Sequence, residues 1–409
     1  MAGKSKEDKD TPMEKRLKYL KGSFEKASFP ELSDSLEEVL YSLESAGLVV
    51  GIAGESGAGK STFINSFREL REEDEGAAPT GRADTSRGPT PYPHPKYDNV
   101  ILWDLPSIDS PEFQRKDYLE QISASRYDFV VVMACQHFTS LHARLALHIK
   151  NASKAFYFVR SKVDADLEAR RSSNPLGFID AVALQRIREE CMKDLKAEGV
   201  KFPKLFLISN SQLSKYDFSR FVETLEKNLQ LEKSHCFLMA APNVSHRILE
   251  RKKSAMVEHL WLASVVAASC QTVPIPEISI ACNLDHLAQT LRGYCTSLGL
   301  EDSSLRRAAR QAEQPLELFR ALVRSPLAAA VTPALVVELL EEAAGKAAKL
   351  PKQLVPMTSL GPSFSVVYNM LRVFVDSAAA DAHKILVRAF MSHKPTSEQA
   401  AEASQVTDS

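Results

Sequence analysis

The sequence lacks several features that would assign it to a common functional class. Its 51 basic and 52 acidic side chains nearly cancel, so no excess of positive charge would attract nucleic acid. The six cysteines form no C-x-x-C pair, which argues against zinc and disulfide frameworks and is typical of thiols in a reducing compartment. The longest apolar stretch, residues 260–270, is shorter than the ~20 residues that a transmembrane helix needs.

The N-terminal stretch also lacks a targeting signal. "MAGKSKEDKDTPMEK" is polar and charged, unlike a signal peptide or a transit sequence. Ala2 rather than glycine follows the first methionine, so the stretch is not a myristoylation site. These absences predict a cytoplasmic protein with no transmembrane segment, no signal peptide and no nucleic-acid partner.

Glycine is scarce, with 16 residues in the chain, yet three glycines fall within the segment "GESGAGKST" at 54–62. An apolar run precedes this segment and an apolar helical pattern follows it, as in the strand–loop–helix of a phosphate-binding P-loop. A plain glycine-rich turn is the alternative, but a turn has no need of the Lys60-Ser61 pair. Lys60 would reach the β- and γ-phosphates and the Ser61 hydroxyl would ligate Mg²⁺. The predicted phosphate-binding residues are Gly54, Glu55, Ser56, Gly57, Ala58, Gly59, Lys60, Ser61 and Thr62.

Three further segments end predicted strands, where folds of this kind keep their ligands. Asp104, in "WDLPSID", is predicted to hold the Mg²⁺ shell through water, with a strand-ending turn as the alternative. Ser161-Lys162-Val163-Asp164 is similar to the guanine-binding [N/T]-K-x-D motif of GTPases. The carboxylate would accept from two neighbouring N–H groups of guanine, the Lys162 stem would lie over the base, and the Ser161 hydroxyl would brace the P-loop. Ser209-Asn210 would face the guanine carbonyl, although a strand-capping turn is an open alternative.

Residues 72–95, "EEDEGAAPTGRADTSRGPTPYPHP", lie where a mobile switch loop belongs. Thr80 is the predicted sensor of Mg²⁺ and the γ-phosphate, and with Lys60 it is a predicted catalytic residue. Thr85 and Thr90 are alternatives that the sequence does not exclude. His94 is expected to belong to the structure of this loop.

Short apolar runs alternate with helical patterns in the first half of the chain, and helical patterns dominate the second. This order predicts an α/β domain with a mostly parallel sheet, and an all-helical lobe built from both terminal segments. The predicted strands lie at 48–54, 99–105, 127–135, 155–163 and 204–210. The predicted divisions are a disordered tail at 1–12, a helical segment at 13–47 that packs with the C-terminal lobe, a nucleotide-binding domain at 48–230, a helical domain at 231–393 and a disordered tail at 394–409.

Taken together, these motifs resemble the immunity-related (interferon-inducible) GTPase family. The resemblance rests on "GESGAGKS", "EGAAPTG", "PYPHPKYDNVILWDLP", "RYDF", "FYFVRSKVD" and "LFLISN", with "LRGY" and "RSPLA" similar to the family's helical domain. It covers about residues 13–390 and implies GTP or GDP with Mg²⁺ as cofactors. It also implies a dynamin-like mode, in which GTP-bound subunits pair and associate on internal membranes in cell-autonomous immunity.

The chain departs from the family at Ser107, where the family's D-x-P-G motif has glycine. The backbone amide at this position normally contacts the γ-phosphate. At the next position, small GTPases have a glutamine that orients the attacking water, whereas this chain has Ile108. GTP binding with slow hydrolysis is therefore expected. The alternative is a hydrolysis-impaired nucleotide-binding scaffold or regulator of related GTPases. An ATPase is a third interpretation, and it would require Asp164 to be irrelevant to affinity.

Two helical patterns allow more than one interpretation. Segment 333–350 has an apolar face that matches the family's membrane-associating helix, but its polar face is slightly acidic, which favours packing in a helical core. Peripheral membrane contact therefore remains an expectation from the resemblance. The face consists of Val336, Leu339, Leu340, Ala343 and Ala347. The basic cluster at Arg247, Arg251, Lys252 and Lys253 is expected to form a solvated helix face.

Overall fold

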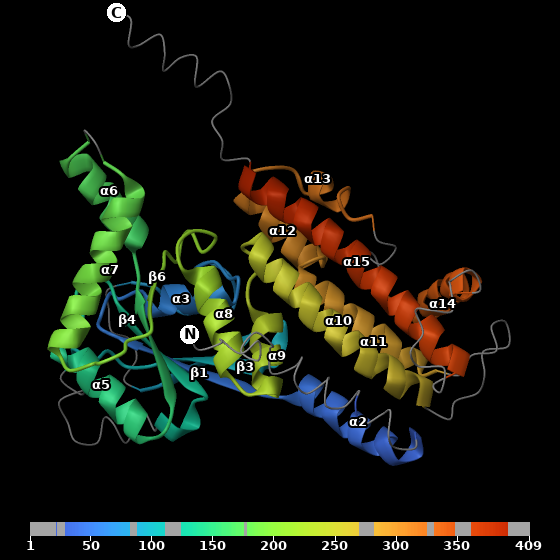
Figure 1. Ribbon diagram of the computed structural model, residues 1–409. Helices are drawn as coiled ribbons and strands as arrows, with labels where there is room; N and C mark the ends of the chain where they lie inside the picture. Colours follow the sequence, from blue (N-terminus) through green and yellow to red (C-terminus); the bar gives the residue numbers. More distant parts are fainter. Residues whose placement is uncertain are drawn as a thin grey trace, which may run out of the picture. The chain divides into compact units, whose positions relative to one another are not determined.

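A computed structural model describes most of the chain and divides it into two compact units. One unit is Ser42–Val244, and the other combines Met1–Tyr41 with Ser245–Ser409 (Figure 1). The described residues are 22, 29–81, 88–110, 124–175, 178–269, 282–324, 331–347 and 361–391. Both predicted disordered tails, and Thr85, lie outside these residues.

The unit Ser42–Val244 contains a six-stranded sheet in the order β2-β3-β1-β4-β5-β6. Only β2 and β3 pair in an antiparallel manner, and the other neighbours are parallel. The prediction of a mostly parallel sheet in an α/β domain is thus confirmed. The strands are β1 (Leu48–Gly54), β2 (Thr90–His94), β3 (Tyr97–Asp104), β4 (Phe129–Ala134), β5 (Ala155–Arg160) and β6 (Leu205–Leu207).

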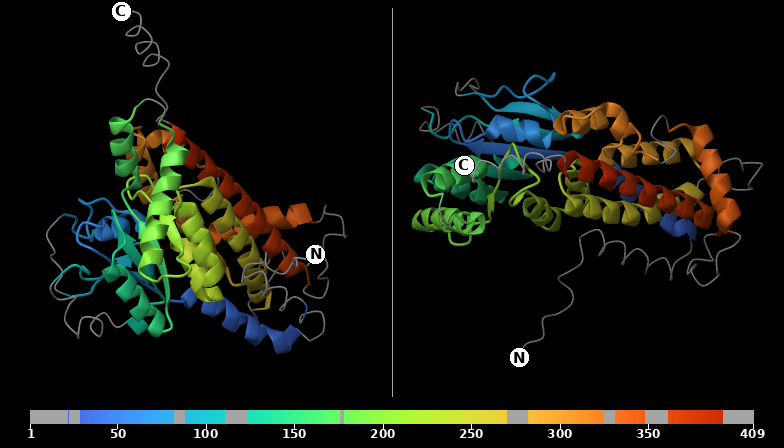
Figure 2. Two further views of the ribbon diagram at one scale, coloured as in Figure 1. Left: turned by 60° about the vertical axis from the view of Figure 1, so that its left-hand side comes forward. Right: turned by 90° about the horizontal axis from the view of Figure 1, so that it is seen from above.

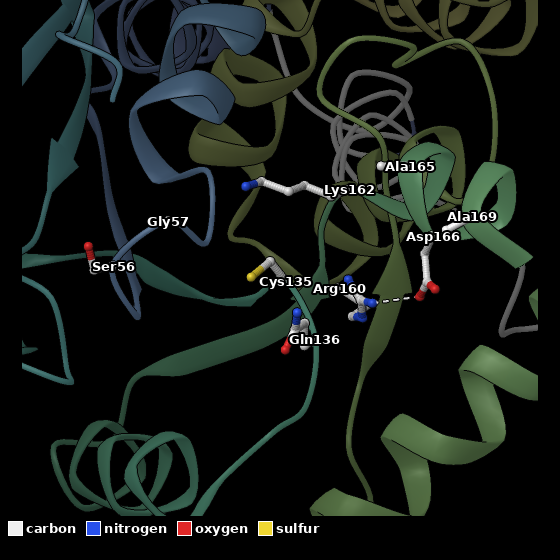
Figure 3. A pocket seen from close by; sticks show the side chains of 9 residues that line it. All are labelled: Ser56, Gly57, Cys135, Gln136, Arg160, Lys162, Ala165, Asp166 and Ala169. Atoms are coloured by element: carbon white, nitrogen blue, oxygen red, sulfur yellow. Dashed lines mark hydrogen bonds and ion pairs between the residues drawn. The ribbon is translucent and has the colours of Figure 1, made fainter. Parts of the chain in front are cut away.

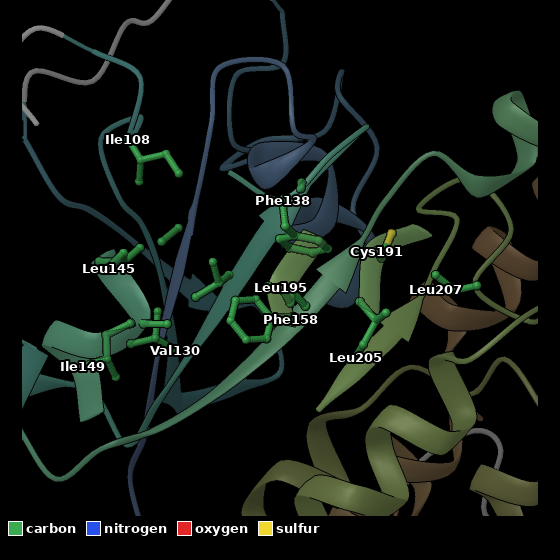
Figure 4. Packing of buried hydrophobic residues seen from close by; sticks show 14 of the residues in the cluster. Ile108, Val130, Phe138, Leu145, Ile149, Phe158, Cys191, Leu195, Leu205 and Leu207 are labelled. Atoms are coloured by element: carbon green, nitrogen blue, oxygen red, sulfur yellow. The ribbon is translucent and has the colours of Figure 1, made fainter. Parts of the chain in front are cut away.

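Helices cover both faces of this sheet, which explains why its central strands are apolar throughout. Val130 and Val132 of β4 share a buried cluster with Leu145 of the helix α5 (Figure 4). Phe129 of β4 faces the other way and packs edge-on against Phe237 of α9, at 5.9 Å between ring centroids. The helices of this unit include α3 (Lys60–Phe67), α5 (Ser140–Asn151), α6 (Val163–Ser173), α7 (Asp180–Ala197), α8 (Phe218–Asn228) and α9 (Leu231–Ala240).

The edge strand β2 corrects one prediction. Its residues Thr90–His94 were expected within the mobile switch loop, but they pair with β3. Pro91 and Pro93 cannot donate ladder hydrogen bonds, and proline is tolerated because β2 is the last strand of the sheet. His94 is buried, with its ring 5.2 Å from that of Tyr97, so it is part of the core rather than of a loop.

The second unit is helical. Its helix α10 (His246–Ser269) runs along α15 (Gly361–Met391), and α11 (Leu284–Leu298) and α14 (Pro333–Ala347) also pack against α15 (Figure 2). Two shorter helices, α12 (Asp302–Gln311) and α13 (Leu316–Arg320), pack together, and α2 (Phe29–Ser45) spans the division between the units. The helix α9, which the sequence placed with the helical domain, contacts β1 and β3 and belongs to the sheet unit.

Burial bears on two of the helical patterns. Val336 and Leu340 of α14 are fully buried within the helical unit, as the core-packing interpretation predicts. Lys252 of α10 is only 1% exposed and donates from Nζ to the carbonyl of Ser297 at 2.8 Å, so the prediction of a solvated basic face is wrong for this lysine. Among the described helices, none is both long and apolar enough to cross a bilayer.

Candidate functional site

The loop between β1 and α3 has a backbone that only its glycines permit. Gly54 has a φ of 155°, and a Cβ there would lie 2.3 Å from the carbonyl oxygen of Met133. Gly57 and Gly59 have φ values of 74° and 86°, in the left-handed region that side chains disfavour. Gly59 caps the N-terminus of α3, so the loop leads directly into the positive end of a helix dipole. This is the geometry of a phosphate-binding P-loop.

Lys60 lies across this loop rather than in solvent. Its side chain is buried, and Nζ donates to the carbonyls of Gly54 and Glu55 at 3.3 and 3.1 Å. A third bond, of 2.9 Å, joins Nζ to the Ser107 hydroxyl oxygen in the segment that follows β3. The ammonium group therefore lies between the P-loop and the segment expected to contact a γ-phosphate.

Ser61, the residue after Lys60, contacts Asp104 at the end of β3. The Ser61 hydroxyl donates to Oδ2 of Asp104 at 2.7 Å, and the carboxylate is buried. A hydroxyl and a carboxylate oxygen are hard donors of the type that Mg²⁺ takes, so this pair fits the ion. The structure thus brings together the two residues that the sequence assigned to the metal.

Two hydrogen bonds between the Asn65 side chain and the Ala78 backbone fix the chain just before Thr80. The Asn65 amide of α3 accepts from the Ala78 N–H at 2.7 Å and donates to its carbonyl at 2.8 Å. Thr80 lies two residues after Ala78 and is half-buried, whereas Thr90 lies in β2 directly opposite Asp104. The role of Thr80 in sensing the metal stays a prediction.

The base-binding motif follows β5 and begins α6. The Ser161 hydroxyl donates to the P-loop carbonyl of Ala58 at 2.6 Å, which is the brace expected of this residue. Lys162 starts the helix with a φ of 55°. Burial tends to raise the pKa of Asp164, but hydrogen bonds from Ser211, Ser209 and nearby backbone N–H groups outweigh it and lower the pKa. Asp164 therefore carries its charge at neutral pH.

The loop after β6 differs from the expectation in one respect. The Asn210 side chain donates to the Gly59 carbonyl at 3.0 Å, so it ties this loop to the P-loop rather than facing a base. Ser211, which the sequence analysis did not single out, donates to Oδ2 of Asp164 at 2.7 Å. Ser209 contacts Ser211 at 2.9 Å between the hydroxyl oxygens. The polar run Ser-Asn-Ser at 209–211 was the sequence feature that could have pointed to Ser211.

The segment after Asp104 buries both Ser107 and Ile108. Ile108 is 1% exposed and lies in the same apolar cluster as Val130, so its side chain cannot orient a water molecule (Figure 4). Its N–H donates to the Gly54 carbonyl at 3.1 Å. Ser107 is also buried, with its hydroxyl on Lys60.

A cavity of about 570 Å³ opens beside the P-loop (Figure 3). Its volume lies in the range of small-molecule sites. The Cys135 N–H bonds Glu55 Oε1 at 3.3 Å, and burial, with the Glu55 charge, raises the pKa of the Cys135 thiol. Cys135 and Gln136 directly follow the buried strand β4, but they match no motif in the sequence and were not predicted. The lining residues are Ser56, Gly57, Cys135, Gln136, Arg160, Lys162, Ala165, Asp166 and Ala169.

Comparison with known proteins gives matches over nearly the whole chain. The family model described as interferon-inducible GTPase (IIGP) matches residues 14–389. Interferon-inducible GTPase 5 of Rattus norvegicus is 36% identical over 95% of this chain and 85% of its own length, and the Bos taurus protein of the same name is 36% identical over 93% and 83%. Interferon-inducible GTPase 1 of Mus musculus is 34% identical over 72% of this chain and 70% of its own.

Proposed function

The chain belongs to the interferon-inducible GTPase family, and from this premise we propose that it binds GTP with Mg²⁺ and hydrolyses it slowly to GDP and phosphate. The observation that carries the proposal is the joining of three distant motifs at one edge of the sheet. Ser161 of the base motif bonds Ala58 of the P-loop, and Ser61 of the P-loop bonds Asp104. A nucleotide bound along this edge would meet phosphate, metal and base groups in one continuous site.

The phosphate end depends on fixed charges and dipoles. Lys60 and the α3 N-terminus would stabilise the negative charge that the β- and γ-phosphates carry in the transition state. Ser61 and Asp104 would hold Mg²⁺, with Thr80 as the proposed switch-side ligand. The ion, when bound, neutralises phosphate charge.

The base end selects guanine. The ionised Asp164 would accept from the N1–H and the exocyclic amine, a pair that adenine does not offer. The aliphatic stem of Lys162 would lie over the flat base. Ser211 and Ser209 hold the carboxylate in place, which reduces the conformational freedom that Asp164 would lose on binding.

Slow turnover follows from residues 107 and 108. The buried Ile108 cannot position the attacking water, and the Ser107 hydroxyl already holds the Lys60 ammonium. The Ser107 contact also favours a second candidate, a hydrolysis-impaired scaffold or regulator that retains nucleotide binding. Family membership further supports self-association through the nucleotide domain, peripheral membrane contact from the cytoplasm and a role in cell-autonomous immunity as parts of the proposal.

The test measures nucleotide affinity and phosphate release for the full chain with GTP and with ATP, at rising protein concentration. Tight binding of GTP but not ATP, with release per subunit that rises with concentration, is expected for a GTPase activated by pairing. Tight GTP binding without release at any concentration would instead favour the scaffold. Lys60→Ala is the control, since it removes the P-loop ammonium. Failure of the wild-type chain to bind GTP would reject both candidates.

A further inference from the structure

The segment after β3 also places a carboxylate on the P-loop. Oδ1 of Asp109 accepts from the backbone N–H of Ser56 at 2.8 Å. Two neighbours of Asp109 contact the same loop, since Ser107 accepts from Lys60 and the Ile108 N–H donates to Gly54. Three consecutive residues thus engage the P-loop, and only the third brings a negative charge.

This charge lies on the γ-phosphate side of the site. The base-binding residues Lys162 and Asp164 follow β5, whereas Asp109 follows β3, the strand that ends with the proposed metal ligand Asp104. P-loop N–H groups are the natural donors to phosphate oxygens, and a carboxylate that accepts from one of them occupies the place of such an oxygen. A γ-phosphate that approaches this end of the loop would therefore find the Ser56 N–H already hydrogen-bonded, and the negative charge of Asp109 would repel it.

We propose that Asp109 is a specificity-determining residue that lowers the affinity for GTP relative to GDP. The inference rests on the proposed function and deepens it. GDP lacks the γ-phosphate, so it can bind while the Asp109–Ser56 contact persists. GTP must displace the carboxylate from the Ser56 N–H, whereas the contacts of Ser107 and Ile108 use other P-loop groups and can persist. Arrival of the γ-phosphate is thereby coupled to release of Asp109 from the P-loop.

The experiment is equilibrium binding of fluorescent GDP and fluorescent GTPγS to the full chain in the presence of Mg²⁺. The quantity measured is the ratio of the Kd for GTPγS to the Kd for GDP. Asp109→Asn removes the charge and keeps an acceptor, whereas Asp109→Ala removes both. We expect the ratio to fall about three- to tenfold in Asp109→Ala, and by a smaller factor in Asp109→Asn, as for loss of a charge-assisted contact at an exposed site.

Asp98→Asn is the matched control, because Asp98 is an exposed carboxylate on β3 and its loss changes the net charge equally. Its ratio should equal that of the wild type. An Asp109→Ala ratio within twofold of the wild type, or a higher one, would overturn the inference while the proposed function stands. Failure of the wild-type chain to bind either nucleotide would overturn the proposed function itself, and this inference with it.

Discussion

Asp164 combines a negative charge with a fixed position, and this combination makes it the best single test of guanine recognition. Its pKa is lowered, because hydrogen bonds outweigh the effect of burial. Replacing it by asparagine removes the acceptor pair for guanine and presents an NH₂ group that suits the carbonyl of xanthine. We expect Asp164→Asn to weaken GTP binding by about 10- to 100-fold and to improve binding of xanthosine triphosphate, as measured by competition.

Ser211→Ala is the control for this variant, because it removes one hydrogen bond to Asp164 but keeps the charge. It should weaken GTP binding less than Asp164→Asn does, and it should not favour xanthosine triphosphate. If Asp164→Asn binds GTP as the wild type does, the base site lies elsewhere.

Ser107 permits a test of why turnover is slow. Ser107→Gly removes the hydroxyl that holds Lys60 and frees the backbone, whereas Ser107→Ala removes only the hydroxyl. We expect phosphate release to rise about three- to tenfold in the glycine variant, which loses the hydrogen bond and gains backbone freedom. The alanine variant, which loses only the hydrogen bond, should show a smaller rise. Single-turnover phosphate release at saturating GTP is the measurement. Unchanged release in both variants would show that Ser107 does not limit hydrolysis.

The helix α5 begins with an unusual cap whose effect should depend on pH. Nδ1 of the buried His142 accepts from the Thr139 N–H at 3.1 Å, and Nε2 lies 3.2 Å from the Met133 carbonyl, so the neutral ring donates there. Burial lowers the pKa of His142 below 6.5. The unfolded chain therefore takes up a proton first as the pH falls below 6.5, and the native state loses stability from there down to the native pKa.

His142→Gln supplies a non-titrating side chain that suits the same capping position. We expect this variant to lose less stability between pH 7.5 and 5.5 than the wild type, because glutamine takes up no proton in the native or the unfolded state. Urea unfolding at both pH values measures the difference. An equal slope in His142→Gln would contradict the assignment.

The sequence predicts the strands that are unbroken apolar runs, and it misses elements with a weaker apolar pattern. Prediction and structure agree on β1 at Leu48–Gly54, and β4 was recognised because a strand buried on both faces is an unbroken apolar run. The edge strand β2 was missed because its two prolines resemble a loop. The helix α6 was missed because only Val163 and Leu167 are buried, which is too narrow a stripe to detect.

The residues of the candidate site also divide into those that the sequence predicts and those that it does not. Motif spacing identified Lys60, Ser61 and Asp104, whose contacts follow from the order of strands in the sheet. Ser211 and Asp109 were missed because their roles depend on loop conformations that bring a hydroxyl to Asp164 and a carboxylate to Ser56. The Ser-Asn-Ser run at 209–211 marks a polar loop, but it does not specify which distant segment the loop contacts.

The chain divides into two compact units, so the effect of a substitution in the helical unit can be compared with the effect of a ligand bound in the sheet unit. Lys252 is buried in the helical unit, where its ammonium bonds the Ser297 carbonyl. Lys252→Ala removes this donor and leaves a void, and we expect it to destabilise the helical unit by about 2–4 kcal/mol. Lys253→Ala is the matched control, because Lys253 forms only a partly exposed ion pair with Asp376, of the kind that contributes about 0–1 kcal/mol.

Hydrogen exchange read segment by segment separates the two effects. Lys252→Ala should speed exchange in α10 and α11, while Lys253→Ala should not. GDP at 100 times its Kd stabilises the state that binds it by about 2.7 kcal/mol, so it should slow exchange within residues 42–244, around the P-loop and α6. The GDP affinity of Lys252→Ala should equal that of the wild type, because every proposed nucleotide contact lies in the sheet unit. A weaker affinity in Lys252→Ala with unchanged exchange in α10 would contradict this prediction.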